Sequence, residues 1–256
     1  MEKKNNWSRE ETIVAFYVYC IVPFTKSSKT NSVIIRYADV LGRTPSALNM
    51  KIGNLGRLDP ELKKKNIVGL SHGAKMEKLV WEEFNSDREK LIFEAEKIIE
   101  SITDKSIENT YLQSDEIDYS SEDKIRLIKT RINQNFFRTS VLSAYNNTCA
   151  ITNTQINEFL VASHIKPWAI DKSNRLNPHN GICLNSIHDK AFDRGLITID
   201  KNYRVIISGR LKEYYTNEFI ENVFKKYEGQ KILIPDKFEP SVEFLEYHNE
   251  LIFKGV

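Results

Sequence analysis

Three side chains in the segment 161–200 have the types and the spacing that phosphodiester hydrolysis requires. His164 ends a short apolar run, Asn180 precedes a second one, and His188 lies near the start of a segment with helical character. A neutral histidine can remove a proton from water near physiological pH. A divalent ion stabilises the charge on the scissile phosphate and on the departing oxygen. The residues therefore predict a metal-dependent nuclease site, with the base on a strand and a metal ligand on the following helix.

The pattern of apolar and polar residues predicts the elements that carry these side chains. Apolar residues 159–162 and 182–184 are typical of two short strands, and the polar residues 171–179 between them are typical of a loop. Asn180 can hydrogen-bond to backbone across this loop and so hold the hairpin together. His179, beside Pro178, is interpreted as a loop residue without a chemical role. His72 and His248 are interpreted as structural or exposed residues.

Three segments of the sequence also resemble motifs of a known family: ASHIKPW, NRLNPHNGICL and HDKAFDRGLITID. They are similar to the HNH endonucleases and their ββα-metal finger, in a bacterial branch that includes restriction endonucleases. The resemblance covers about residues 125–253. It implies that His164 is the general base, that Asn180 is the structural asparagine of the finger, and that His188 binds the metal.

The sequence departs from the family pattern at two places. Many HNH proteins have an acid or a second histidine immediately before the base, where this chain has Ser163. Asp193 could supply the missing ligand, or it could hold Arg194. Arg194, like Arg138, could bind a phosphate. Of the paired cysteines that bind structural zinc in many relatives, only Cys149 remains. We therefore predict Mg²⁺ or Mn²⁺ and no structural zinc.

The N-terminal part of the chain predicts a small helical domain. Helices are expected over 8–20, where Ser8 and Glu11 suit a capping box, over 32–41, and over 45–55 with Thr44 as N-cap. The last two resemble a helix-turn-helix, and bases outnumber acids from residue 3 to 75. The alternative is a solvated basic surface that contacts another protein. The predicted DNA contacts are Arg43, Ser46, Asn49, Lys51, Arg138 and Lys166.

The predicted fold class is α+β, with an all-helical domain at 1–102, a linker at 103–123 and an HNH domain with flanking helices at 124–256. A helix over 75–102, interrupted near Asn85 and Ser86, would serve as a connector or a dimer helix. In the second domain a hairpin is expected to begin at Cys149–Thr152. Further strands are expected over 196–199 and 205–208, and helices over 216–225 and 241–253.

The composition fits a soluble protein of the cytoplasm. The chain has 256 residues, 41% of them hydrophobic, and a net charge of +2. No apolar run approaches the roughly 20 residues that cross a bilayer, so no membrane association is expected. The N-terminus lacks the apolar core of a signal peptide. The three cysteines form no pattern of pairs and are expected to be free thiols.

Two classes of function are compatible with these features. The first is a metal-dependent DNA endonuclease of restriction or defence type, acting on double-stranded DNA as a homodimer, with a cognate methyltransferase as partner. The second is a catalytically inactive DNA-binding protein with an HNH fold, which Ser163 would favour. A variant of the first is a nuclease that acts on RNA or on structured DNA.

Overall fold

The computed structural model describes residues 6–67, 73–103 and 120–255, and the chain divides into two compact units, Met1–Ser140 and Val141–Val256. The division falls inside helix α8 (Ser121–Ala144), not at the linker predicted over 103–123. Most of that linker, and His72, lie outside the described residues. The predicted domain bounds therefore stay a prediction, and the two units are described separately below.

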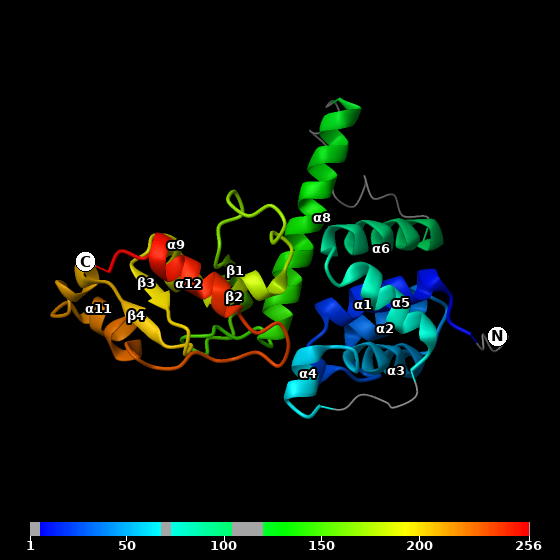
Figure 1. Ribbon diagram of the computed structural model, residues 1–256, viewed down its shortest axis with the longest axis horizontal. Helices are drawn as coiled ribbons and strands as arrows, with labels where there is room; N and C mark the ends of the chain where they lie inside the picture. Colours follow the sequence, from blue (N-terminus) through cyan, green and yellow to red (C-terminus); the bar gives the residue numbers. More distant parts are fainter. Residues whose placement is uncertain (1–5, 68–72, 104–119, 256) are drawn as a thin grey trace. The chain divides into compact units, whose positions relative to one another are not determined.

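The first unit is built around helix α1 (Arg9–Ile21). The predicted capping box forms, because the Ser8 hydroxyl accepts from the Glu11 N–H and the Glu11 carboxylate accepts from the Ser8 N–H. Every residue from Thr12 to Ile21 is buried, as expected for a helix that is covered on all sides. Four helices pack against α1 (Figure 1): α2 (Ser32–Val40), α3 (Pro45–Gly56), α5 (Lys75–Phe84) and α6 (Arg88–Thr103). The short elements η1 (Phe24–Lys26) and α4 (Pro60–Lys64) complete it.

The local predictions for this unit are confirmed. Thr44 caps α3 by accepting from the Ala47 N–H at 3.2 Å, with Pro45 in the first turn. The helix expected over 75–102 is interrupted at residues 85–87, between α5 and α6. Helices α2 and α3 pack on each other. Their use as a DNA-reading helix-turn-helix stays a prediction.

The second unit contains a hairpin with a helix packed on it. Strand β1 (Leu160–His164) pairs antiparallel with β2 (Gly181–Asn185), with Ser163 opposite Ile182 and His164 opposite Gly181. Helix α9 (Ser186–Asp193) contacts both strands. Asn185 caps α9, since its side-chain oxygen accepts from the N–H groups of Ile187 and His188. The predicted order of strand, loop, strand and helix is therefore confirmed.

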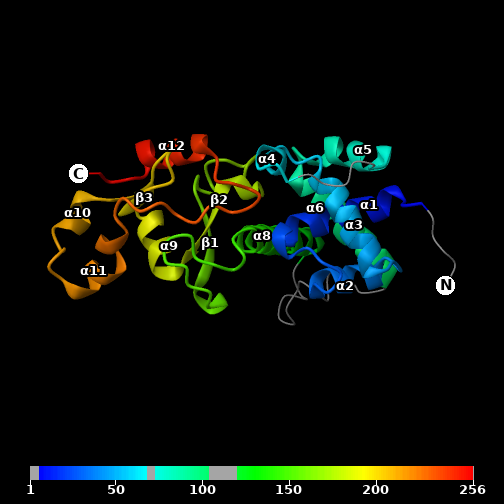
Figure 2. The same cartoon turned by 90° about the horizontal axis from the view of Figure 1, so that it is seen from below.

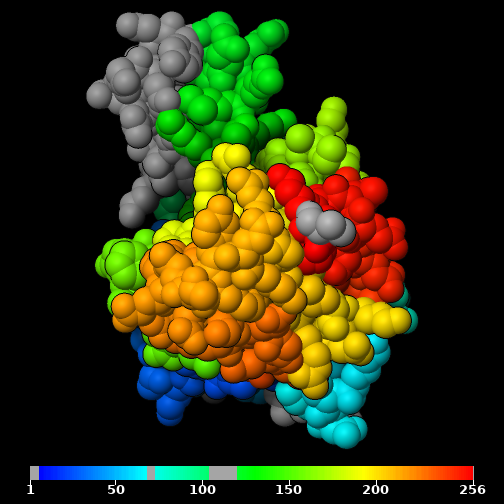
Figure 3. Space-filling model, turned by 90° about the vertical axis from the view of Figure 1, so that its left-hand side faces the viewer, coloured from blue at the N-terminus to red at the C-terminus, as the bar shows by residue number. Residues whose placement is uncertain are grey.

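A second hairpin and a C-terminal helix complete the core of this unit. Strand β3 (Ile197–Ile199) pairs antiparallel with β4 (Val205–Ile207). Helix α12 (Val242–Leu251) and helix α9 both contact β3, which lies between them in Figure 2. Between β4 and α12 the chain forms α10 (Gly209–Lys212), α11 (Glu218–Val223) and η5 (Lys225–Tyr227), the orange layer in Figure 3. The short turn η3 (Asn157–Phe159) precedes β1, and η4 (Pro178–Asn180) ends the loop that leads into β2.

The hairpin predicted to begin at Cys149–Thr152 is wrong. Residues 150–152 form a turn, with Asn153 at a positive φ of 59°. The N–H of Ala150 donates to the Cys183 carbonyl at 2.7 Å, and its carbonyl accepts from the Leu233 N–H at 2.8 Å. The backbone N–H and C=O groups of Ala150 therefore bond to distant parts of the unit and not to a partner strand of a local hairpin. Cys20, Cys149 and Cys183 are all buried thiols.

None of the helices in the described part of the chain is long and apolar enough to cross a membrane.

His248 joins three elements of the second unit and should make its stability depend on pH. The ring is 1% exposed and lies parallel to the Phe192 ring at 3.7 Å. Its Nε2 donates to the Phe192 carbonyl at 3.1 Å, and its Nδ1 accepts from the Thr198 hydroxyl at 2.8 Å. Burial lowers the pKa of His248 to about 4, although the bond to Phe192 opposes this.

We expect the free energy of unfolding to fall as the pH drops from about 6.5 towards 4. The unfolded chain takes up a proton near pH 6.5, while folded His248 stays neutral, so acid favours the unfolded state by up to about 3 kcal/mol. Chemical denaturation should show that wild-type protein loses about 2 kcal/mol more than His248→Gln between about pH 7.5 and 5. Equal losses for the two proteins would contradict this prediction.

Candidate active site

His164 ends β1 and is held by the loop that follows it. Its Nε2 lies 3.0 Å from the Arg175 carbonyl oxygen, and its ring meets the Trp168 ring at 87° with centroids 5.5 Å apart. A carbonyl can only accept, so the proton of the neutral ring is on Nε2 and the lone pair is on Nδ1. Burial lowers the pKa of His164, and the bond to Arg175 opposes this. The ring is therefore neutral at physiological pH, as a general base must be.

Asn180 ties together the two ends of the loop. Its side-chain oxygen accepts from the Lys166 N–H at 2.8 Å, and its amide donates to the carbonyls of Lys166 at 3.0 Å and Asn174 at 3.3 Å. The residue is 0% exposed, so these bonds are shielded from water. Asn180 is thus in position to hold the loop, not to touch a reacting atom.

The loop also has its own polar network around Asp171. The carboxylate accepts from the Ser173 hydroxyl at 2.7 Å and the Asn174 amide at 3.0 Å. It also pairs with the Lys166 ammonium at 3.0 Å. These contacts hold the pKa of Asp171 far below its usual range. Lys166, a predicted DNA contact, is therefore engaged in fixing the loop, and its ammonium also lies 4.9 Å from the Tyr247 ring.

His188 points towards a different part of the unit. The ring is 2% exposed and lies 5.2 Å from the Phe224 ring and 5.7 Å from the Tyr227 ring. Its Nε2 lies 2.8 Å from the Val223 carbonyl oxygen and its Nδ1 3.1 Å from the Asn185 side-chain oxygen. Burial lowers its pKa to about 4. A carbonyl can only accept, so the proton of the neutral ring is on Nε2, and Nδ1 faces the Asn185 oxygen that already accepts from two backbone N–H groups.

The neighbouring residue, Asp189, lies beside strand β1. The hydroxyl of Ser163, the residue before His164, is buried and makes no hydrogen bond of regular geometry, yet it lies close enough to Asp189 to favour its charged form. Burial is the larger effect and raises the pKa of Asp189. Asp193 lies one turn further along α9, and burial and the charge of Asp189 raise its pKa as well.

These two carboxylates are the oxygen donors that fit a hard divalent cation. In the ranges that the structure describes, no basic side chain forms an ion pair with either of them, although Lys190 and Arg194 lie near enough to favour the charged form of Asp193. Two like charges side by side are stabilised by a cation between them. Among the same residues no cluster of three or more histidine, cysteine or acidic side chains could hold a metal. Water and phosphate oxygens must therefore complete any coordination.

The comparison with protein families agrees with this geometry. Residues 149–200 match the model of a family described as HNH endonuclease. This segment is therefore similar to the HNH endonucleases. The match includes the β1–β2 hairpin, α9 and β3. No curated protein matches the chain.

The sequence patterns did not single out Asp189 as a candidate metal ligand. The residues HD at 188–189 offer two adjacent polar groups, and the histidine is the more familiar ligand. The available signal was the spacing of Asp189 and Asp193, which places two carboxylates on one helical face. Of the other predicted residues of the HNH segment, Arg194 is exposed at the end of α9, and His179 anchors the C-terminal segment through its Nδ1, 2.8 Å from the Glu239 carbonyl oxygen.

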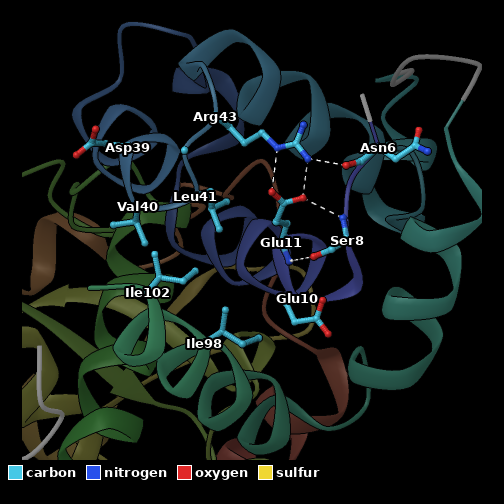
Figure 4. A pocket seen from close by; sticks show the side chains of 11 residues that line it. Asn6, Ser8, Glu10, Glu11, Asp39, Val40, Leu41, Arg43, Ile98 and Ile102 are labelled. Atoms are coloured by element: carbon cyan, nitrogen blue, oxygen red, sulfur yellow. Dashed lines mark hydrogen bonds and ion pairs between the residues drawn. The ribbon is translucent and has the colours of Figure 1, made fainter. Parts of the chain in front are cut away.

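Arg43, predicted to contact DNA, is part of the packing of the first unit. Its guanidinium pairs with the Glu11 carboxylate at 3.0 and 2.7 Å and donates to the Asn6 carbonyl at 2.6 Å. Only 7% of its side chain is exposed, and it lies over the Trp7 ring. Figure 4 shows Arg43 turned onto Glu11 at the edge of a cavity of about 580 Å³. Glu11 compensates the charge that was expected to attract phosphate.

The other predicted DNA contacts have different environments. Lys51 is 4% exposed and pairs with the buried Glu77 at 2.6 Å, so it too is occupied inside the unit. The Asn49 side chain accepts from the Ser27 hydroxyl at 2.6 Å, whereas Ser46 is exposed. Arg138 lies exposed on α8, within the first unit. Contact between any of these residues and DNA stays a prediction.

Proposed function

We propose that the protein is a metal-dependent endonuclease that hydrolyses phosphodiester bonds in double-stranded DNA, in a restriction or defence role. The observation that carries the proposal is His164. It ends a strand of an HNH finger, its neutral form has the lone pair on Nδ1, and its neighbour Ser163 lies beside the carboxylate of Asp189. In the proposal, His164 and the carboxylate of Asp189 serve one site at the end of β1.

In this proposal each residue has a separate task. His164 takes a proton from water onto Nδ1 while the water oxygen forms a bond to phosphorus and the bond from phosphorus to the leaving oxygen breaks. Asp189 and Asp193 would hold Mg²⁺ or Mn²⁺, in place of the His188 predicted earlier. A bound ion would neutralise charge on the phosphate and on the leaving oxygen. Asn180 keeps the loop closed, and Arg194, which follows α9, supplies positive charge.

Recognition of DNA is assigned to the first unit. Helix α3 presents Ser46 and the 58% exposed Met50 to solvent, and these replace Arg43 and Lys51 as the residues expected in a groove. A symmetric dimer is proposed, because two copies related by a two-fold axis can cut both strands of a palindromic site. In a restriction role, a methyltransferase would protect the host DNA.

The test is incubation of the pure protein with supercoiled plasmid, linear duplex, single strands and RNA, each with Mg²⁺, Mn²⁺ or EDTA. We expect nicking and linearisation of the plasmid with either metal and none with EDTA. Cleavage of RNA or single strands alone would replace the substrate in the proposal. Binding of duplex DNA without cleavage under any metal would instead indicate a catalytically inactive HNH protein.

A further inference from the structure

Arg175 makes three contacts that converge on the proposed base. Its carbonyl accepts from Nε2 of His164 at 3.0 Å. Its side-chain Nε donates to the Trp168 carbonyl at 2.8 Å, and its guanidinium carbon lies 5.3 Å from the centre of the Trp168 ring. The same Trp168 ring meets the ring of His164. Arg175 therefore contacts His164 directly through its backbone carbonyl and indirectly through its side chain, which holds Trp168 against the His164 ring.

These contacts explain how the loop between β1 and β2 can hold the His164 ring in one orientation with its proton on one nitrogen. The bond from His164 is to a backbone carbonyl, which stays in place only if the loop does. The guanidinium fixes that backbone from the other side, by a hydrogen bond and by stacking on an aromatic face, where arginine is favoured over lysine. The ring of Trp168 limits rotation of His164 at the same time. Arg175 is half-buried, so these contacts are partly shielded from water.

We infer that Arg175, acting through Trp168, is a positioning residue that keeps the proton of His164 on Nε2 and its lone pair on Nδ1, directed at the attacking water. The inference rests on the proposed function, in which His164 is the base. The competing role for a basic loop residue in a nuclease is contact with a DNA phosphate. The two roles predict different kinetics, because a phosphate contact contributes to binding and to its salt dependence.

Kinetics of full-length variants separate these roles. We expect Arg175→Ala and Arg175→Lys to lower kcat by about 10- to 10²-fold with little change in KM or in the salt dependence of DNA binding, since misplacement of a reacting group affects the chemical step. Lysine keeps the charge but cannot make the Nε bond, so it should not rescue. Trp168→Ala should lower kcat to a similar degree, and the double variant should be no slower than the slower single variant. Trp168→Phe, which keeps a ring, should retain most activity.

Two further measurements decide whether the effect passes through His164. In a His164→Gln background, Arg175→Ala should have no additional effect on the residual rate. Nitrogen NMR of the histidines should show His164 with its proton on Nε2 in the wild type and a mixture of the two neutral forms in Arg175→Ala. A raised KM with unchanged kcat, rescue by lysine, or an unchanged NMR signature would overturn the inference. The NMR result does not depend on cleavage, so a protein without nuclease activity would refute the proposed function and leave the positioning testable.

Discussion

Replacing His164 with glutamine or alanine is expected to lower the rate of DNA cleavage by about 10²- to 10⁴-fold while leaving DNA binding intact, because a general base contributes that much to a hydrolytic step. Glutamine is the sharper of the two variants. Its side-chain amide can donate to the Arg175 carbonyl as Nε2 of His164 does at 3.0 Å, so the loop should stay in place without a base. Single-turnover cleavage of plasmid in Mg²⁺, with DNA affinity measured in parallel, checks both parts.

The pH dependence of the wild-type cleavage rate tests His164 in a second way. The base must be neutral, so the cleavage rate falls as the pH falls through the pKa of His164. Because burial lowers that pKa, the rate should stay on its plateau to a pH below about 6.5, the ordinary value for histidine. The matched control is His179→Asn, which keeps a donor for the Glu239 carbonyl and should cleave like the wild type. Cleavage by His164→Gln within tenfold of the wild-type rate would remove His164 from the role of base.

Local patterns in the sequence were sufficient to predict most elements of this fold. The capping box at Ser8 and Glu11 and the cap at Thr44 involve residues three apart, so the sequence alone contains both partners. The apolar runs that became β1 and β2 are short and bounded by polar residues. The turn at 150–152 was not predicted, because residues far away in the sequence determine its conformation. Its hydrogen bonds go to Cys183 and Leu233, which are distant in the sequence.

Contacts between residues distant in the sequence also determine which basic residues of the first unit are available to phosphate. An excess of positive charge predicted contact with phosphate, but Arg43 pairs with Glu11, 32 positions away, and Lys51 pairs with Glu77, 26 positions away. A charge count cannot show which bases are already neutralised by an acid brought close by folding. Burial decides it, since a lysine or arginine inside a protein is almost always paired.

His188 and Asp189 are adjacent on helix α9, so their side chains point in different directions. Neighbouring residues on a helix point about 100° apart, so one of the two must turn away from β1 if the other faces it. Which one does so depends on how α9 packs against β1 on one side and against Val223 and Phe224 on the other. Histidine is the more familiar metal ligand, but the packing turns His188 towards Val223 and Asp189 towards Ser163.

Replacing Asp189 with asparagine is expected to lower metal-dependent cleavage by about 10²- to 10³-fold, because a bound ion contributes several kcal/mol to stabilising the transition state. His188→Gln should cleave nearly as well as the wild type, because glutamine can donate to the Val223 carbonyl in place of Nε2. The pair of variants therefore tests which of two adjacent residues serves the metal. Steady-state cleavage over a range of Mn²⁺ concentrations measures the effect on both rate and metal requirement.

Thermal unfolding gives a readout of the same site that does not require activity. In EDTA, Asp189→Asn should unfold at a slightly higher temperature than the wild type, because it removes a half-buried charge that repels Asp193. Addition of Mn²⁺ should raise the wild-type midpoint, since the ion binds only the folded state, and should have little effect on the variant. His188→Gln should keep the response to Mn²⁺. If His188→Gln lost that response and Asp189→Asn kept it, the histidine would be the ligand, and its ring would have to turn away from Val223 or Asn185 when the metal binds.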